Sequence, residues 1–89
     1  QGVCFYKYKN ITYMFLSRSY GRRNSSKLEV YNYSSMTLIN KFILPPMLEE
    51  ITVSNDRLLL VYESGSSKYR NDCNYIVEDI ISIDVKKLI

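Results

Sequence analysis

The chain has 89 residues, of which 46% are hydrophobic and 24% are charged, and its net charge is +3. This length limits it to one small domain with a modest core, and the composition excludes a disordered chain. The slight basic excess is well below that of a typical electrostatic nucleic-acid binder, and no apolar run is long enough to span a bilayer. Nine tyrosines and no alanine favour strands over helices, because aromatic side chains fit a pleated surface.

The first half of the chain predicts four strands. In the first of them, alternation with a period of two places Val3 and Phe5 on one side and Cys4 on the other. The second is a nearly continuous apolar run, which is typical of a strand buried on both faces. Pro45-Pro46 ends the fourth and marks it as an edge strand, because proline cannot donate to a sheet ladder. The four predicted strands are Gly2–Tyr8, Ile11–Ser17, Leu28–Tyr33 and Thr37–Leu44.

The second half of the chain repeats this order. A short alternating run, matched to Gly2–Tyr6, is followed by a turn, an apolar run, a long polar loop and a closing strand. These segments are Glu50–Ser54, Ser54-Asn55-Asp56, Leu58–Tyr62, Gly65–Val77 and Asp79–Val85, after which Leu88-Ile89 take the place of Leu38-Ile39. We therefore predict an all-β antiparallel meander of two repeats, residues 1–46 and 47–89, with a length typical of propeller blades.

Short segments spread over nearly the whole chain carry a further signal. They are Gln1-Gly2-Val3, Leu16–Arg22, Ser26-Lys27-Leu28, Leu44–Met47, Glu49-Glu50-Ile51, Val61–Ser64, Lys68-Tyr69-Arg70 and the closing Asp79–Val85. In this combination they resemble blades of a bacterial β-propeller-like family. The resemblance implies a fold and no particular reaction, because propellers with this strand rhythm include lyases, hydrolases, sensors and scaffolds.

Two blades are fewer than a propeller needs, which is about four to eight. Each blade buries one face against the next, so two blades alone leave apolar faces and unpaired edges in water. We therefore expect this chain to be the C-terminal part of a larger propeller, or to be completed by other chains. The expected partners are the remaining blades or other protein chains, whereas a nucleic acid is not an expected partner.

The resemblance also implies where a ligand binds. Propeller ligands meet the mouth of the central channel, where inner strands start and certain loops converge. The candidate ligand-binding residues at these positions are Gln1, Arg18, Tyr20, Arg22, Glu50, Glu63, Tyr69 and Arg70. Arg18 and Glu63 hold equivalent places with opposite charge, which fits an ion pair between blades. Alternatively, Arg18 and Arg22 hold a carboxylate or phosphate through their guanidinium groups.

Catalytic and metal-binding groups are sparse in this sequence. The chain has no histidine, so a Ser-His-Asp arrangement within it is excluded and a structural zinc site is not expected. Glu49 and Glu50 point to opposite faces of a strand and cannot act as a close acid–base pair. We predict no catalytic residue, metal or cofactor in this chain.

Two cysteines and three glycosylation sequons bear on the compartment. Cys4 and Cys73 form one disulfide in an oxidising compartment or remain thiols in a reducing one, and both alternatives stay open. The sequons at Asn10, Asn24 and Asn32 favour a secreted or cell-surface protein.

Three functions remain open at this point, in the following order. The first is a binding or structural module that is completed by other chain segments or subunits. The second is part of a propeller enzyme whose catalytic residues lie mostly outside this chain. The third is a small β-barrel that binds single-stranded nucleic acid through tyrosines beside Arg22-Arg23 and Lys68–Arg70.

Overall fold

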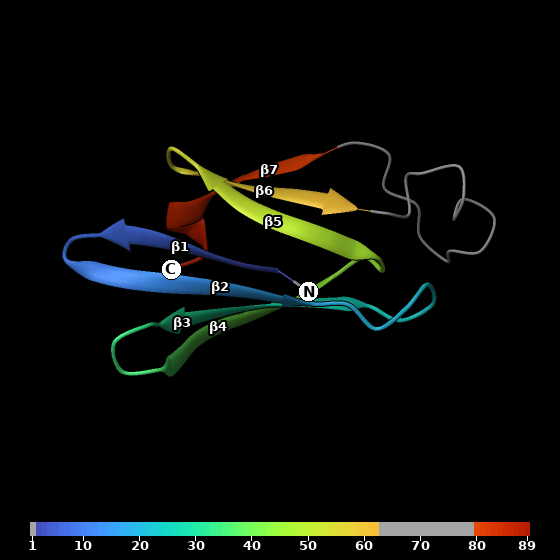
Figure 1. The fold of residues 1–89 in the computed structure, drawn as a ribbon, viewed down its shortest axis with the longest axis horizontal. Helices are drawn as coiled ribbons and strands as arrows, with labels where there is room; N and C mark the ends of the chain where they lie inside the picture. The colour runs from blue at the N-terminus through green and yellow to red at the C-terminus, as the bar shows by residue number, and fades with distance from the viewer. Residues whose placement is uncertain (1, 63–79) are drawn as a thin grey trace.

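The chain folds into two antiparallel β-sheets, and the predicted all-β class is confirmed (Figure 1). The computed structural model describes residues 2–62 and 80–89. The first sheet has the strand order β1-β2-β3-β4, and the second has the order β5-β6-β7. The strands are β1 Gly2–Tyr8, β2 Ile11–Arg18, β3 Ser26–Asn32, β4 Thr37–Leu44, β5 Leu48–Ser54, β6 Arg57–Tyr62 and β7 Ile81–Asp84, and a 3₁₀ turn, η2, spans Val85–Lys87.

Left-handed backbone conformations close the first hairpin of each sheet. Lys9 and Asn10 have φ angles of 50° and 64°, and Asn55 has a φ angle of 55°. Such turns match the right-handed twist of antiparallel strands, and asparagine tolerates this conformation better than most residues do. The turn predicted at Ser54-Asn55-Asp56 is therefore confirmed, and Lys9-Asn10 form the equivalent turn of the first sheet.

The strand registers also fix how the two sheets correspond. Tyr8 pairs with Ile11, and Ser54 pairs with Arg57, so the β5–β6 hairpin follows its β1–β2 equivalent by 46 residues. The sequence alignment, which matched Glu50–Ser54 with Gly2–Tyr6, is therefore wrong by two residues. It compared apolar patterns without fixing the position of the turn, and a period of two leaves a shift of two residues undetected.

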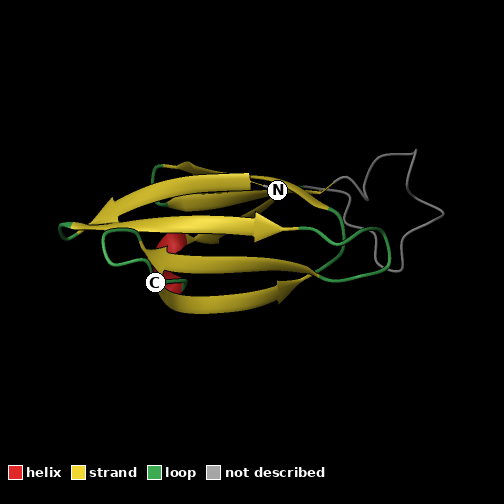
Figure 2. Ribbon diagram, turned by 60° about the horizontal axis from the view of Figure 1, so that its bottom comes forward, coloured by secondary structure: helices red, strands yellow, loops and turns green. Residues whose placement is uncertain are grey.

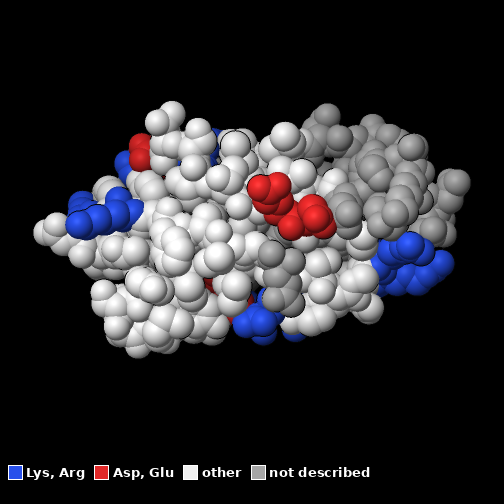
Figure 3. All heavy atoms as spheres, in the orientation of Figure 1, with Lys and Arg blue, Asp and Glu red and all other residues white. Residues whose placement is uncertain are grey.

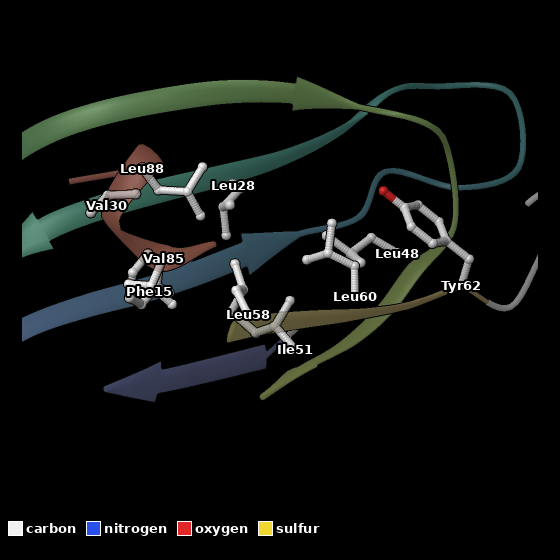
Figure 4. Close-up of a cluster of buried hydrophobic side chains, with 10 residues drawn as sticks. All are labelled: Phe15, Leu28, Val30, Leu48, Ile51, Leu58, Leu60, Tyr62, Val85 and Leu88. Atoms are coloured by element: carbon white, nitrogen blue, oxygen red, sulfur yellow. The ribbon is translucent and has the colours of Figure 1, made fainter. Parts of the chain in front are cut away.

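The hydrophobic core lies between the two sheets (Figure 4). Between the sheets, the backbones of β1 and β5 approach most closely, and the sheets diverge from there towards β4 and β7 (Figure 1). Apolar side chains fill the space that this divergence leaves. They are Phe15, Leu28, Val30, Leu48, Ile51, Leu58, Leu60 and Tyr62, with Val85 and Leu88 from the C-terminal segment.

Only one side of β2 faces this core. Phe15 and Ser17 have no exposed surface, whereas Met14 and Leu16 on the other side are half-buried. The predicted burial of Ile11–Ser17 on both faces is therefore wrong. The physical reason is that no element in the described part of the chain covers the second face.

The C-terminal segment fills the gap between the diverging sheets instead of adding a strand. Asp84 caps η2 by accepting a hydrogen bond from a backbone amide two residues later, at 3.0 Å. The Asn40 side-chain amide on β4 donates to the Leu88 carbonyl at 2.9 Å, and the turn lies between the two layers (Figure 2). The predictions of a strand through Val85 and of a fourth strand at Leu88-Ile89 are wrong, because Val85 and Leu88 fill the core.

Both sheets are open. The edges of the first sheet are β1 and β4, which confirms β4 as an edge strand, and the edges of the second are β5 and β7. No closed barrel forms from residues 2–62 and 80–89, and the nucleic-acid alternative stays a prediction. The polar loop predicted at Gly65–Val77 lies outside the described residues.

Candidate interaction surface

The first sheet has one face against the core and one that points away from β5–β7. We call the second one the outer face, and strand alternation assigns to it every other residue of β1–β4. It carries apolar side chains, of which Val3, Phe5 and Ile43 are 52%, 48% and 63% exposed. It also carries charged ones, which are Lys7, Arg18, Lys27, Glu29 and Lys41. The apolar residues of the outer face are Val3, Phe5, Met14, Leu16, Tyr31, Tyr33, Leu38 and Ile43. Several large apolar side chains exposed on one face are typical of an interaction site.

Cross-strand contacts hold the outer face in one arrangement. The rings of Phe5 and Tyr33 meet edge to face, with their centroids 5.0 Å apart. Met14 stands directly opposite Phe5 on β1 and opposite Tyr31 on β3. Such pairs of aromatic and aliphatic side chains stabilise a sheet by about 0.2–1 kcal/mol each. The outer face is therefore preformed in this chain by itself.

One ion pair lies on the outer face among these apolar side chains. Arg18 Nε donates to Glu29 Oε1 at 3.0 Å, and the Tyr31 hydroxyl donates to the same oxygen at 3.2 Å. The hydrogen bond from Arg18 lowers the pKa of Glu29 below its ordinary 4.5, and the Glu29 carboxylate in turn raises the pKa of Arg18. The side chain of Glu29 is only 13% exposed, so a sheet that covers the outer face would bury this pair as well.

Arg18 has a partner that the sequence interpretation did not name. The sequence interpretation paired Arg18 with Glu63 or with a bound anion, and Glu63 lies outside the described residues. Glu29 stands opposite Leu16 on the neighbouring strand, one diagonal step from Arg18. The charge of Arg18 is therefore neutralised within the first sheet.

A shallow depression of about 460 Å³ lies at the end of the β2–β3 hairpin, next to the predicted ligand residues Tyr20 and Arg22. The Lys27 ammonium lies 5.3 Å from the centre of the Tyr20 ring, and the Asn24 amide donates to the Tyr20 carbonyl at 2.9 Å. Its described lining consists of Tyr20, Asn24, Ser25 and Lys27. The Lys27 ammonium and the Tyr20 ring already contact each other. We therefore interpret the depression as part of a solvated surface loop.

The other predicted ligand residues are not brought to this hairpin end. Glu50 is exposed on β5 and points away from the core. Within the described chain it shares no hydrogen bond or ion pair with Arg18. Gln1, Glu63, Tyr69 and Arg70 lie outside the described residues. The alternative of a propeller enzyme, which depends on residues outside this chain, stays a prediction.

Sequence reasoning missed a cluster at the opposite end of the sheets, around the β1–β2 turn. The Tyr6 hydroxyl donates to Asp56 Oδ1 at 2.7 Å, and this hydrogen bond raises the pKa of Tyr6 to about 12. The ammonium groups of Lys9 and Lys86 lie 5.3 and 5.1 Å from the centre of the Tyr8 ring. Basic side chains gather towards the two ends of the molecule in Figure 3. The partners lie far apart in the chain, so no local motif indicates the cluster.

Cys4 lies half-buried on the core side of β1. Burial raises the pKa of its thiol to about 11, so the reactive thiolate is scarce at neutral pH. Cys73 lies outside the described residues, and the disulfide between the two stays a prediction.

The described residues hold no assembled metal centre, because no three His, Cys, Asp or Glu side chains among them come together. In the same part of the chain, no helix has the length and apolar character needed to cross a membrane.

Comparisons with known proteins show no relative of this chain. No protein-family model matches it, and neither a curated protein nor a solved structure is significantly similar to it. The functional conclusion below therefore depends on the geometry of the two sheets.

Proposed function

We propose that this chain is a structural or binding module of a larger β-protein, in which another β-sheet covers the outer face. In this proposal the two sheets are blade-like units of a propeller-like assembly. The missing units come from other chain segments or from other subunits. The observation that supports the proposal is the apolar outer face, on which Val3 and Phe5 are about half exposed.

A β-sheet is the partner that this face fits. The opposite face of the same sheet already packs on β5–β7, and apolar side chains fill the space between the two layers. The outer face offers the same kind of surface, an array of alternate side chains from four neighbouring strands. Full burial of a Val, Ile or Phe side chain contributes about 1.5–3 kcal/mol, so completing the burial of Phe5 contributes roughly half as much.

The test measures whether the outer face drives association of the chain. The dye ANS, which binds exposed apolar surface, should fluoresce with the chain. Light scattering after size exclusion should show self-association that rises with concentration without reaching a fixed stoichiometry, because a second copy lacks the matching face. Phe5→Lys should reduce both signals, because it places a charge among the exposed apolar side chains of β1. The monomer should lose no more than about 1 kcal/mol of stability, since Phe5 is 48% exposed.

A matched control separates this effect from a general gain in solubility. Ile80 is 62% exposed and lies before β7, away from the outer face. Ile80→Lys adds the same charge and should leave association and ANS fluorescence as they were. A monomer that binds no ANS at any concentration would contradict the proposal, and so would equal effects of the two substitutions.

A further inference from the structure

We infer that the covering sheet stacks head to tail on this chain. The covering sheet contacts the outer face of β1–β4. The face that it uses resembles the core-side face of β1–β4, the one that packs on β5–β7. This inference rests on the proposed function, and it adds the direction of stacking and the chemistry of the partner face.

The equivalence of the two hairpins shows which faces correspond. With an offset of 46 residues, Phe5 on β1 is equivalent to Ile51 on β5, and Met14 on β2 is equivalent to Leu60 on β6. Ile51 and Leu60 point into the core between the sheets and are 4% and 1% exposed. Phe5 and Met14 lie on the outer face, which points away from that core.

The third strands of the two sheets agree with this assignment. Tyr31 on β3 stands opposite Met14, and Ile81 on β7 stands opposite Leu60, so Tyr31 and Ile81 are equivalent. These three pairs are apolar in both sheets, whereas Thr12 and Lys7 on the outer face are equivalent to the apolar Leu58 and Val53. Because Ile81 is 37% exposed, the outer face is the counterpart of a face of the second sheet that is buried along β5 and β6.

The two sheets therefore meet through unlike faces. A two-fold arrangement would bring equivalent faces together, whereas here the face containing Phe15 in one sheet meets the face containing Ile51 in the other. An interface between unlike surfaces leaves the complementary surface free to repeat the same contact. The same contact repeated on the outer face places a neighbouring sheet over Phe5.

The existing junction also indicates what the neighbour presents at Phe5. Gly2 of β1 lies so close to β5 that an added Cβ would come 3.3 Å from atoms of Ile51. The adjacent Ser17 and Ser26 are small and completely buried, and the Ser26 hydroxyl accepts a hydrogen bond from the Leu48 amide. A neighbour that stacks in the same way carries glycine or another small residue opposite Phe5.

A second copy of this chain does not supply that face. Its available sheet face would be the outward side of β5–β7, where Glu50 and Thr52 are the equivalents of Cys4 and Tyr6. Both Glu50 and Thr52 are exposed, so this outward side presents polar side chains to Val3, Phe5 and Met14 instead of the apolar side chains that β1–β4 turns towards β5–β7. The occupant is therefore a different β-sheet with a core-type face.

The test keeps the full 89-residue chain intact and adds a second copy of residues 1–46 at its N-terminus. This added copy carries the face that β1–β4 turns towards β5–β7. The added copy also carries Phe5→Lys, which weakens ANS binding to its own outer face. Docking should cover the outer face of the original copy, so ANS fluorescence should not exceed that of the unextended chain, although an undocked extra sheet would add exposed apolar surface. Phe5→Lys in the original copy should then lower the urea midpoint of the extended chain more than it lowers that of the unextended chain.

A variant in the added copy tests the close approach. Gly2→Val there should raise ANS fluorescence above that of the unextended chain, whereas Ser25→Val, in an exposed loop, should not. In the extended chain without these two variants, ANS fluorescence above that of the unextended chain would overturn head-to-tail stacking. So would a symmetric dimer of the 89-residue chain in which NMR shows Phe5 of one copy against Phe5 of the other. In that dimer the outer face would remain an interaction surface, whereas an unextended monomer without ANS binding would remove the proposed function itself.

Discussion

Glu29 accepts two hydrogen bonds on the outer face of the first sheet. Because Arg18 lowers its pKa, the folded protein favours the carboxylate more than the unfolded chain does. The resulting stabilisation is present above the ordinary pKa of 4.5. It is lost as the pH falls through the lower pKa of the folded state.

Replacing this carboxylate should therefore matter at neutral pH and not in acid. We expect Glu29→Gln to lower the free energy of unfolding by about 1 kcal/mol at neutral pH, since the pair is partly exposed. Below the folded-state pKa of Glu29, the variant and the original protein should unfold at the same urea concentration. Urea titrations at both pH values measure this. Glu49→Gln, at an exposed position, is the control, and an equal loss in acid would contradict the prediction.

Side-chain alternation could be predicted at this scale, but partners across strands could not. The alternation in Gly2–Tyr8 correctly places Val3 and Phe5 on one face of the strand and Cys4 on the other, because alternation depends only on the period of a strand. The partner of Arg18 depends on the register of β2 against β3, which a seven-residue connection sets. The sequence offers several carboxylates, and nothing local selects Glu29.

The start of β5 is tied to the first sheet by one hydroxyl group. The Leu48 amide donates to Ser26 Oγ at 3.1 Å in a completely buried position. Ser26→Ala leaves this buried amide without its acceptor, so we expect a loss of about 1–3 kcal/mol in the free energy of unfolding. Urea unfolding measures the loss, and Ser25→Ala in the exposed loop should show none. Unchanged stability of Ser26→Ala would mean that the amide does not need this hydroxyl.

Most strands could be predicted because local chemistry decides them. The bounds predicted for Gly2–Tyr8 and Thr37–Leu44 agree with β1 and β4, since turn residues and a Pro-Pro pair mark their ends. The C-terminal segment could not be predicted in this way. Asp84-Val85-Lys86 alternates as a strand does, and only the gap between the diverging sheets makes a turn with buried Val85 the better arrangement.

The distribution of stability over the whole molecule follows from which strands are central. In the order of the sheets, β2, β3 and β6 have neighbours on both sides, whereas β4 is an edge strand with mostly exposed side chains. We expect the amide hydrogens of β2 and β6 to exchange most slowly and those of β4 much faster. Hydrogen exchange followed by NMR measures this. Protection of β4 equal to that of β2 would show that its edge is covered in solution.

The divergence of the two sheets bears on the shape of such an assembly. β1 and β5 lie close together while β4 and β7 lie far apart, so each added sheet is tilted in the same sense about the side on which β1 and β5 meet. Successive tilts add up, so that a row of such sheets curves around that side. A repeated rotation of constant sense gives a ring if the rotations sum to a full turn, and an open helical array if they do not. In the proposed assembly, Val85 and Leu88, which fill the gap between the sheets, therefore help to set the rotation from one sheet to the next.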